Sequence, residues 1–195
     1  VTILTCVKGL PEVQEWSNKT PLKCINLYGV LIMIFKLDLK KFLISIAIPL
    51  SVGGISALIV HGNTDIYSKI NQPPLAPPSW VFPVVWTVLY LLMGISLYII
   101  WNTRADSGKK QLAFLLFGIQ LFLNLIWSPI FFGLQLFLPA LIVLVFTWIF
   151  TAAMIVSFYS ISKPAALLQI PYIIWLTFAG YLNFAIYLIN WKKRQ

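Results

Sequence analysis

The stretch between Lys110 and Lys163 contains no charged residue, and this feature constrains the fold more than any other in the sequence. Such a stretch is long enough for two helices that cross a bilayer, since one crossing takes about 20 residues. The rest of the chain is similar: 60% of the residues are hydrophobic, 10% are charged, and the mean hydropathy is +0.90. These values lie far outside the range of soluble globular domains. The chain is therefore predicted to be an integral membrane protein.

Five apolar segments follow one another, each long enough to cross a membrane as a helix. Their predicted ranges are residues 42–60, 81–101, 111–132, 137–159 and 164–191. The last two connections are short enough for tight helical hairpins only, whereas the first, residues 61–81, is long and rich in proline. The predicted fold is an all-α bundle of five transmembrane helices with one long proline-rich loop between helices 1 and 2.

Residues 1–35 differ from the rest, because they are mixed in polarity and their one apolar run, residues 25–35, is too short to span. We expect them to be an N-terminal extension that is poorly ordered or not native, with Met33 as the natural start. Residues 36–195 are expected to form the transmembrane domain.

The net charge of +9 comes mostly from basic residues at the ends of segments, as membrane helices have, and does not indicate a nucleic-acid partner. An inside N-terminus would place more of them on the inner side, which is the usual bias. The inner set is Lys36, Lys40, Lys41, Arg104, Lys109, Lys110 and Lys163; the outer set is Lys69, Lys192, Lys193 and Arg194. We therefore expect the N-terminus inside and the proline-rich loop outside.

Charged residues and histidine are absent from the predicted spans. No carboxylate lies in them, and the only histidine, His61, stands at a helix end. General acid–base catalysis, metal binding and proton-coupled transport all require such groups in the membrane. We predict no catalytic residue and no metal site; the sequence favours a protein that is not an enzyme without deciding the point.

The spans do carry aromatic rings and neutral amides at helical spacing. The faces are Trp86, Tyr90 and Gly94 in the second span, Gln120, Asn124 and Trp127 in the third, and Tyr172, Trp175, Ala179 and Asn183 in the fifth. Amides in hydrocarbon need partners, so they are expected to face the bundle interior. They can simply tie helices together, or they can line a cavity for a flat, largely apolar ligand. Both interpretations fit the pattern.

The long loop carries two proline pairs, Pro73–Pro74 and Pro77–Pro78, and leads directly into Trp80. Each proline fixes its own φ and disfavours helical geometry in the residue before it, so the loop is expected to be stiff. Such loops and interfacial tryptophans also occur in membrane proteins that bind nothing. The functional alternative is a rigid lid over a ligand site.

Three motifs resemble the TspO/MBR family, the translocator proteins or tryptophan-rich sensory proteins, also called peripheral benzodiazepine receptors. The first is Pro-Pro-Ser-Trp-x-Phe-Pro-x-Val-Trp-Thr-x-Leu-Tyr-x-x-Met-Gly at residues 77–94. The second is Gln-x-x-x-Asn-x-x-Trp-Ser-Pro-x-Phe-Phe-Gly at residues 120–133, and the third is Pro-Tyr-x-x-Trp-x-x-Phe-Ala-x-Tyr-Leu-Asn at residues 171–183. They occur in the family's order, and the resemblance covers residues 42–190.

The resemblance implies a bacterial-type, often dimeric, five-helix protein of the cell membrane that binds porphyrins such as protoporphyrin IX or haem. By position, Trp86 and Trp175 match the family's cavity tryptophans, which are linked in bacterial members to light-dependent porphyrin breakdown. Tyr67, Asn124, Trp127, Ala179 and Asn183 match other cavity positions. The complete expected ligand-binding set is Tyr67, Pro77, Pro78, Trp80, Trp86, Tyr90, Gln120, Asn124, Trp127, Tyr172, Trp175, Ala179 and Asn183.

The loop departs from the family pattern, which usually reads Lys-Pro-x-Trp-x-Pro-Pro. Gln72 and Leu75 stand at the lysine and tryptophan positions, and Ile66 replaces the usual tryptophan before Tyr67. A lid with fewer indoles is expected to bind porphyrin more weakly or differently.

The expected function is tetrapyrrole binding in the membrane, with a regulatory or stress-sensing role in porphyrin handling. No obligatory cofactor is expected, and the expected partners are the bilayer, the tetrapyrrole and a second copy of the chain. The alternatives are light-dependent porphyrin degradation that uses Trp86 and Trp175, and a small facilitator-type transporter of porphyrin-like ligands.

Overall fold

The computed structural model describes residues 38–60 and 72–191. The expected N-terminal extension, loop residues 61–71 and the last four residues lie outside the described part. The helical unit begins at Leu39.

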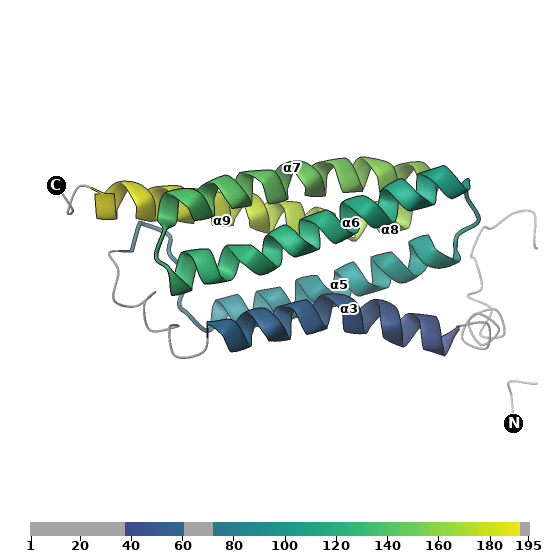
Figure 1. The fold of residues 1–195 in the computed structure, drawn as a ribbon, viewed down its shortest axis with the longest axis horizontal. Coiled ribbons are helices and arrows are strands. Elements are labelled where there is room, and N and C mark those ends of the chain that lie inside the picture. Colours follow the sequence, from purple (N-terminus) through teal and green to yellow (C-terminus); the bar gives the residue numbers. More distant parts are fainter. Residues whose placement is uncertain (1–37, 61–71, 192–195) are drawn as a thin grey trace, which may run out of the picture. The chain divides into compact units, whose positions relative to one another are not determined.

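Five helices long and apolar enough to cross a membrane form the described part, which contains no β-strand (Figure 1). They are α3 (Leu39–Ile59), α5 (Val81–Asn102), α6 (Ser107–Ser128) with the π-helical turn η1 (Pro129–Gly133), α7 (Phe137–Ile161), and α8 (Lys163–Leu167) followed by α9 (Ile170–Trp191). The predicted all-α fold with five spans is confirmed.

Two of the differences from the predicted ranges have local reasons. α6 begins at Ser107 and not at residue 111, because the Asp106 carboxylate accepts hydrogen bonds from the N–H groups of Gly108 (2.9 Å) and Lys109 (3.2 Å). The fifth span is interrupted between Leu167 and Ile170. Pro171 explains this break, because its ring would clash with the Leu167 carbonyl in a continuous helix.

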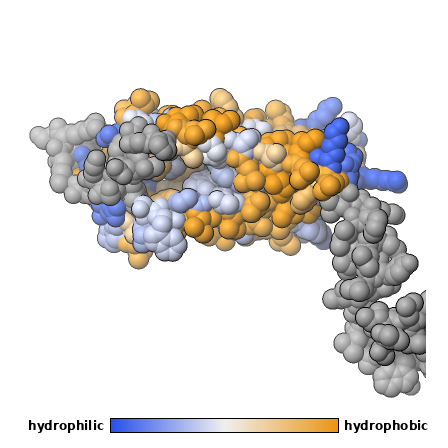
Figure 2. All heavy atoms as spheres, turned by 90° about the horizontal axis from the view of Figure 1, so that it is seen from below, coloured by the Kyte–Doolittle hydropathy of each residue, from blue (hydrophilic) through white to orange (hydrophobic). Residues whose placement is uncertain are grey.

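The helices pack as neighbouring pairs, α3 with α5, α6 with α7, and α7 with α9. Large apolar side chains such as Leu58, Leu115 and Val156 point outward and are exposed. Figure 2 shows apolar side chains over much of one face, with strongly hydrophilic ones near the ends. An apolar outer surface of this kind requires contact with lipid.

Two glycines allow α3 and α5 to approach closely. A Cβ atom added at Gly94 would lie 2.7 Å from the Ile46 Cα and 2.9 Å from the Ser45 carbonyl oxygen, so only glycine fits there. On the opposite helix, Gly53 faces the ring of Tyr90, whose Cδ2 would lie 2.7 Å from an added Cβ. These two contacts fix how the helices cross.

We predict that Gly94→Ala lowers the free energy of unfolding by about 1–3 kcal/mol. The new methyl group would meet the backbone of α3, which cannot move aside as a side chain can. Thermal unfolding in detergent, followed by circular dichroism, measures the change. Gly118→Ala on α6 is the matched control, since an added Cβ there meets nothing within 4 Å. Equal losses in both variants would contradict the close approach.

Candidate functional site

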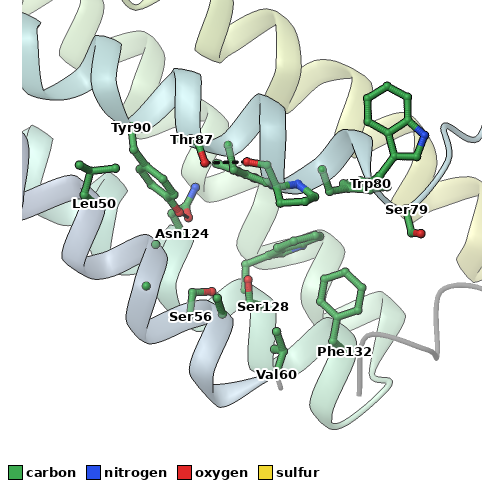
Figure 3. A pocket seen from close by; sticks show the side chains of 17 residues that line it. Leu50, Ser56, Val60, Ser79, Trp80, Thr87, Tyr90, Asn124, Ser128 and Phe132 are labelled. Carbon is green, nitrogen blue, oxygen red and sulfur yellow. Dashed lines mark hydrogen bonds between the residues drawn. The ribbon is translucent and has the colours of Figure 1, made fainter. Parts of the chain in front are cut away.

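A cavity of about 580 Å³ lies between α3, α5 and the end of α6 (Figure 3). α3 and the residue that follows it contribute Leu50, Gly53, Gly54, Ser56, Ala57 and Val60. The start of α5 and the residues before it contribute Ser79, Trp80, Phe82, Pro83, Trp86, Thr87 and Tyr90. α6 and η1 contribute Asn124, Trp127, Ser128 and Phe132.

The space exists because α3 presents small side chains where α5 and α6 present rings. An added Cβ at Gly54 would meet no atom within 4 Å, so this part of the α3 wall is open. Ser56 and Ala57, which also have small side chains, line the same side of the cavity. The α3–α5 contact at Gly53 and Tyr90 closes the cavity at its deep end, beyond which the helices touch.

The turn η1 shapes the far wall. Pro129 cannot donate a backbone hydrogen bond, and the helix widens there, so that the Leu134 N–H donates to the Pro129 carbonyl at 2.9 Å. The widened turn brings Phe131 and Phe132 against Trp127, with ring centroids 5.0 and 5.9 Å from that of the indole. Trp127 and Phe132 therefore form one aromatic wall.

The described lining of the cavity is aromatic and uncharged. Trp80, Trp86 and Trp127 line it, and the rings of Trp86 and Tyr90 stack at 5.5 Å with an interplanar angle of 27°. None of the described lining residues is charged. Such a wall with a few hydroxyl and amide groups suits a flat, largely apolar ligand.

Polar groups lie along the cavity and at both of its ends. Figure 3 shows Tyr90 and Asn124 together at one end and Ser79 and Trp80 at the other. The first end lies deep in the bundle, where both side chains are buried, and the second lies where the loop enters α5. A ligand would therefore place its apolar body along the rings and any charged substituent at the Ser79 end.

Hydrogen bonds continue from the deep end into the closed core. The Tyr90 hydroxyl donates to Asn124 Oδ1 (2.9 Å), and Asn124 Nδ2 donates to the Tyr172 hydroxyl oxygen (3.1 Å). The Tyr172 hydroxyl in turn donates to Gln120 Oε1 (3.0 Å). Tyr172 and Gln120 are fully enclosed and do not line the cavity. The chain of bonds joins α5, α6 and α9.

The expected ligand-binding residues divide into four groups. The cavity lining contains Trp80, Trp86, Tyr90, Asn124 and Trp127, and the hydrogen-bond chain behind it adds Gln120 and Tyr172. The described lining does not include Pro77, Pro78, Trp175, Ala179 or Asn183. Tyr67 lies outside the described residues.

The fifth span lies behind the cavity and does not line it. The Trp175 ring packs edge-on against Phe82, with centroids 5.9 Å apart, and Phe82 itself lines the cavity. Asn183 bonds to groups of the protein itself. In the amide orientation that pairs both its nitrogen and its oxygen, it donates to the Phe137 carbonyl at 2.9 Å and accepts from the Trp127 indole at 3.2 Å. It thus ties α9 to α7 and holds a cavity tryptophan in place.

The described part of the loop contacts α9. Residues Pro73 to Ala76 form a turn in which the Ala76 N–H donates to the Pro73 carbonyl at 3.2 Å and Leu75 has a φ of 68°. Proline at the second position and positive φ at the third define a type II turn. The Tyr181 hydroxyl donates to the Pro74 carbonyl at 2.9 Å. The second proline pair leads from this anchored turn to Ser79 and Trp80.

The wall supplied by α3 was missed by sequence reasoning. Its signal was present as a run of small residues, Ser51, Gly53, Gly54, Ser56 and Ala57. Such runs usually mark close helix contacts. Here Gly53 makes such a contact, whereas Gly54 and Ala57 border empty space.

Protoporphyrin IX serves as a flat, largely apolar probe of the cavity. We predict that Gly54→Leu lowers the affinity for this probe by about tenfold or more, because the new side chain occupies the cavity. Quenching of tryptophan fluorescence measures the affinity. Gly180→Leu on α9 also adds its Cβ where nothing lies within 4 Å, but it does not line the cavity and should bind like the unsubstituted protein. Unchanged affinity in a folded Gly54→Leu protein would show that this probe does not bind in the cavity.

Comparison with known proteins identifies the family. A model of the TspO/MBR family matches residues 45–188, which include most of all five spans. Tryptophan-rich protein TspO of Archaeoglobus fulgidus is 38% identical over 155 residues, covering 79% of this chain and 99% of the relative. The protein of the same name from Chlorobaculum tepidum is 43% identical over 124 residues, covering 64% of this chain and 78% of the relative.

An animal protein is also similar. Translocator protein of Bos taurus is 37% identical over 130 residues, covering 66% of this chain and 77% of the relative. With five apolar spans and a family match over most of its length, the chain belongs to the TspO/MBR family of integral membrane proteins.

Proposed function

We propose that this protein binds a tetrapyrrole, such as protoporphyrin IX or haem, in the cavity between α3, α5 and α6, and serves a sensing or regulatory role in porphyrin handling. The observation that carries the proposal is the cavity itself, about 580 Å³ in volume and walled by Trp80, Trp86 and Trp127 without a charged lining residue among those described. A relative from Cereibacter sphaeroides is named tryptophan-rich sensory protein, which supports the sensing role.

The cavity walls hold the ligand by stacking and by excluding water. Trp86 stacks on Tyr90 and contacts the Tyr172 ring edge-on at 6.2 Å, so its indole plane is fixed before a ligand arrives. Trp127 is fixed in the same way by Phe131 and Phe132. Fixed rings lose little entropy on binding, and aromatic contacts contribute about 0.5–1.5 kcal/mol each beyond burial. The carboxylates of a porphyrin would remain at the Ser79 end, next to the loop.

We predict that Trp86→Phe weakens protoporphyrin IX binding severalfold, because a phenyl ring keeps part of the stacking area. Trp148→Phe is the matched control: Trp148 lies on α7, is 41% exposed, and donates to the Thr177 hydroxyl at 2.9 Å, away from the cavity lining. Titration in lipid nanodiscs, followed by the porphyrin absorbance band, measures both. Equal affinities of the two variants, or no saturable binding by the unsubstituted protein, would contradict the proposal.

The proposal includes a homodimer in a bacterial cell membrane with the N-terminus inside. The distribution of basic residues supports this orientation, and bacterial relatives support the location. The mass of the protein in native-like nanodiscs tests the dimer.

A further inference from the structure

The hydrogen-bond chain at the deep end of the cavity has a direction. Each group donates to the next, from the Tyr90 hydroxyl through Asn124 and Tyr172 to Gln120 Oε1. In this direction the Tyr90 hydroxyl donates its hydrogen to Asn124. Towards a ligand, Tyr90 can then act only as an acceptor, through its oxygen. At the other end of the chain, the buried Gln120 Nε2 has no hydrogen-bond partner.

The same heavy atoms allow the opposite direction. Turning both amides by 180° exchanges their oxygen and nitrogen atoms, which have nearly the same size and position. Gln120 Nε2 would then donate to Tyr172, Tyr172 to Asn124 Oδ1, and Asn124 Nδ2 to the Tyr90 oxygen. Three hydrogen bonds remain, and the unpaired atom becomes Gln120 Oε1. The Tyr90 hydroxyl keeps its hydrogen, which is then free to point into the cavity.

We propose that this chain reverses on ligand binding, and that Gln120 and Tyr172 are the positioning residues that permit the reversal. This proposal rests on the proposed function, and it says which hydrogen-bonding groups of a ligand the same site can accept. With the chain in the direction described, Tyr90 takes a ligand that donates a hydrogen bond; after reversal, it takes a ligand that accepts one, such as a carbonyl. The cavity thus accepts flat, largely apolar ligands that carry either a hydrogen-bond donor or a hydrogen-bond acceptor.

Both directions contain three hydrogen bonds, so their number favours neither. The hydrogen-bonding group of the ligand therefore determines which direction the chain adopts. A hydrogen bond between buried partners matters most when its loss would leave a group unpaired. A ligand carbonyl near the Tyr90 oxygen would receive no hydrogen bond from Tyr90 in the first direction and would receive one in the second. Neither Gln120 nor Tyr172 lines the cavity, so their substitution changes the ligand's polar partner without altering the wall.

Gln120→Leu tests the idea because it removes the final acceptor. The Thr151 hydroxyl, which lies near Tyr172, can also accept the Tyr172 proton, so all variants carry Thr151→Val. Tyr172 can then donate only to Asn124 Oδ1, which fixes the reversed direction. Gln169→Leu is the matched control, since Gln169 is equally buried, has no side-chain hydrogen bond, and does not line the cavity.

The first readout is the infrared C–O stretching band of Tyr90, identified in protein with isotope-labelled tyrosine as the band that Tyr90→Phe removes. This band distinguishes a donating from an accepting phenol. Fluorenone, a flat ketone, should shift the band in the Thr151→Val protein, and fluorene, the same rings without the carbonyl, should not. In the Gln120→Leu protein, the band should already be shifted without ligand; in the Gln169→Leu protein, it should not.

The second readout is the ratio of the affinities for fluorenone and fluorene. Gln120→Leu should raise this ratio severalfold, up to the roughly tenfold that one hydrogen bond can supply. In a Tyr172→Phe background, which keeps the ring but breaks the chain, Gln120→Leu should have no further effect. An unchanged Tyr90 band in Gln120→Leu, or an equal change of the ratio in the Tyr172→Phe background, overturns the proposal. Absence of protoporphyrin IX binding with the band shift intact would overturn only the proposed function.

Discussion

The interior of a bilayer offers no hydrogen-bond partner, and this constraint organises the whole bundle. An amide or phenol that the spans carry into this interior gains most when it finds a partner inside the protein. Asn124 meets this need by joining Tyr90 on α5 to Tyr172 on α9, and Asn183 meets it by joining α9 to α6 and α7. Both side chains are buried, so the polar groups of the sequence become the ties that hold three or more helices together.

The cavity follows from the way in which α3 is attached to those tied helices. Gly94 brings the backbones of α3 and α5 into contact, and Gly53 makes room for the Tyr90 ring. Gly54 and Ala57 then leave space towards the loop. Rings on α5, α6 and η1 form the opposite walls, and the Tyr90 ring reaches α3 at Gly53. The same class of small residue thus makes a tight contact at one level of the helix and an opening at the next.

Much of this architecture could be predicted from the sequence. The absence of charge and the length of each apolar run predict five spans, and the need of Gln120 and Asn124 for partners predicts that they face inward. Helical spacing also placed Trp86 and Tyr90 on one face, where they stack. These conclusions depend on properties of a single helix in lipid.

The neighbours of each face could not be predicted in this way. Spacing shows that Trp175 and Ala179 share a face, but it does not show that Phe82 lies between Trp175 and the cavity. It likewise shows that α3 has a small-residue face without showing where that face touches a helix and where it borders a void. Asp106 and Pro171 stand in the sequence, but hydropathy alone does not show that the first caps α6 and the second interrupts the fifth span.

Photolabelling tests the central claim, that the ligand lies between α3, α5 and α6, most directly. A porphyrin that carries a photoreactive diazirine is bound in nanodiscs and activated, and the labelled residues are found by mass spectrometry. Adducts on residues 50–60, 79–90 and 124–132 that free protoporphyrin IX prevents are the result we expect. Competed adducts confined to α9, around Trp175 and Ala179, would place the ligand elsewhere and contradict the account.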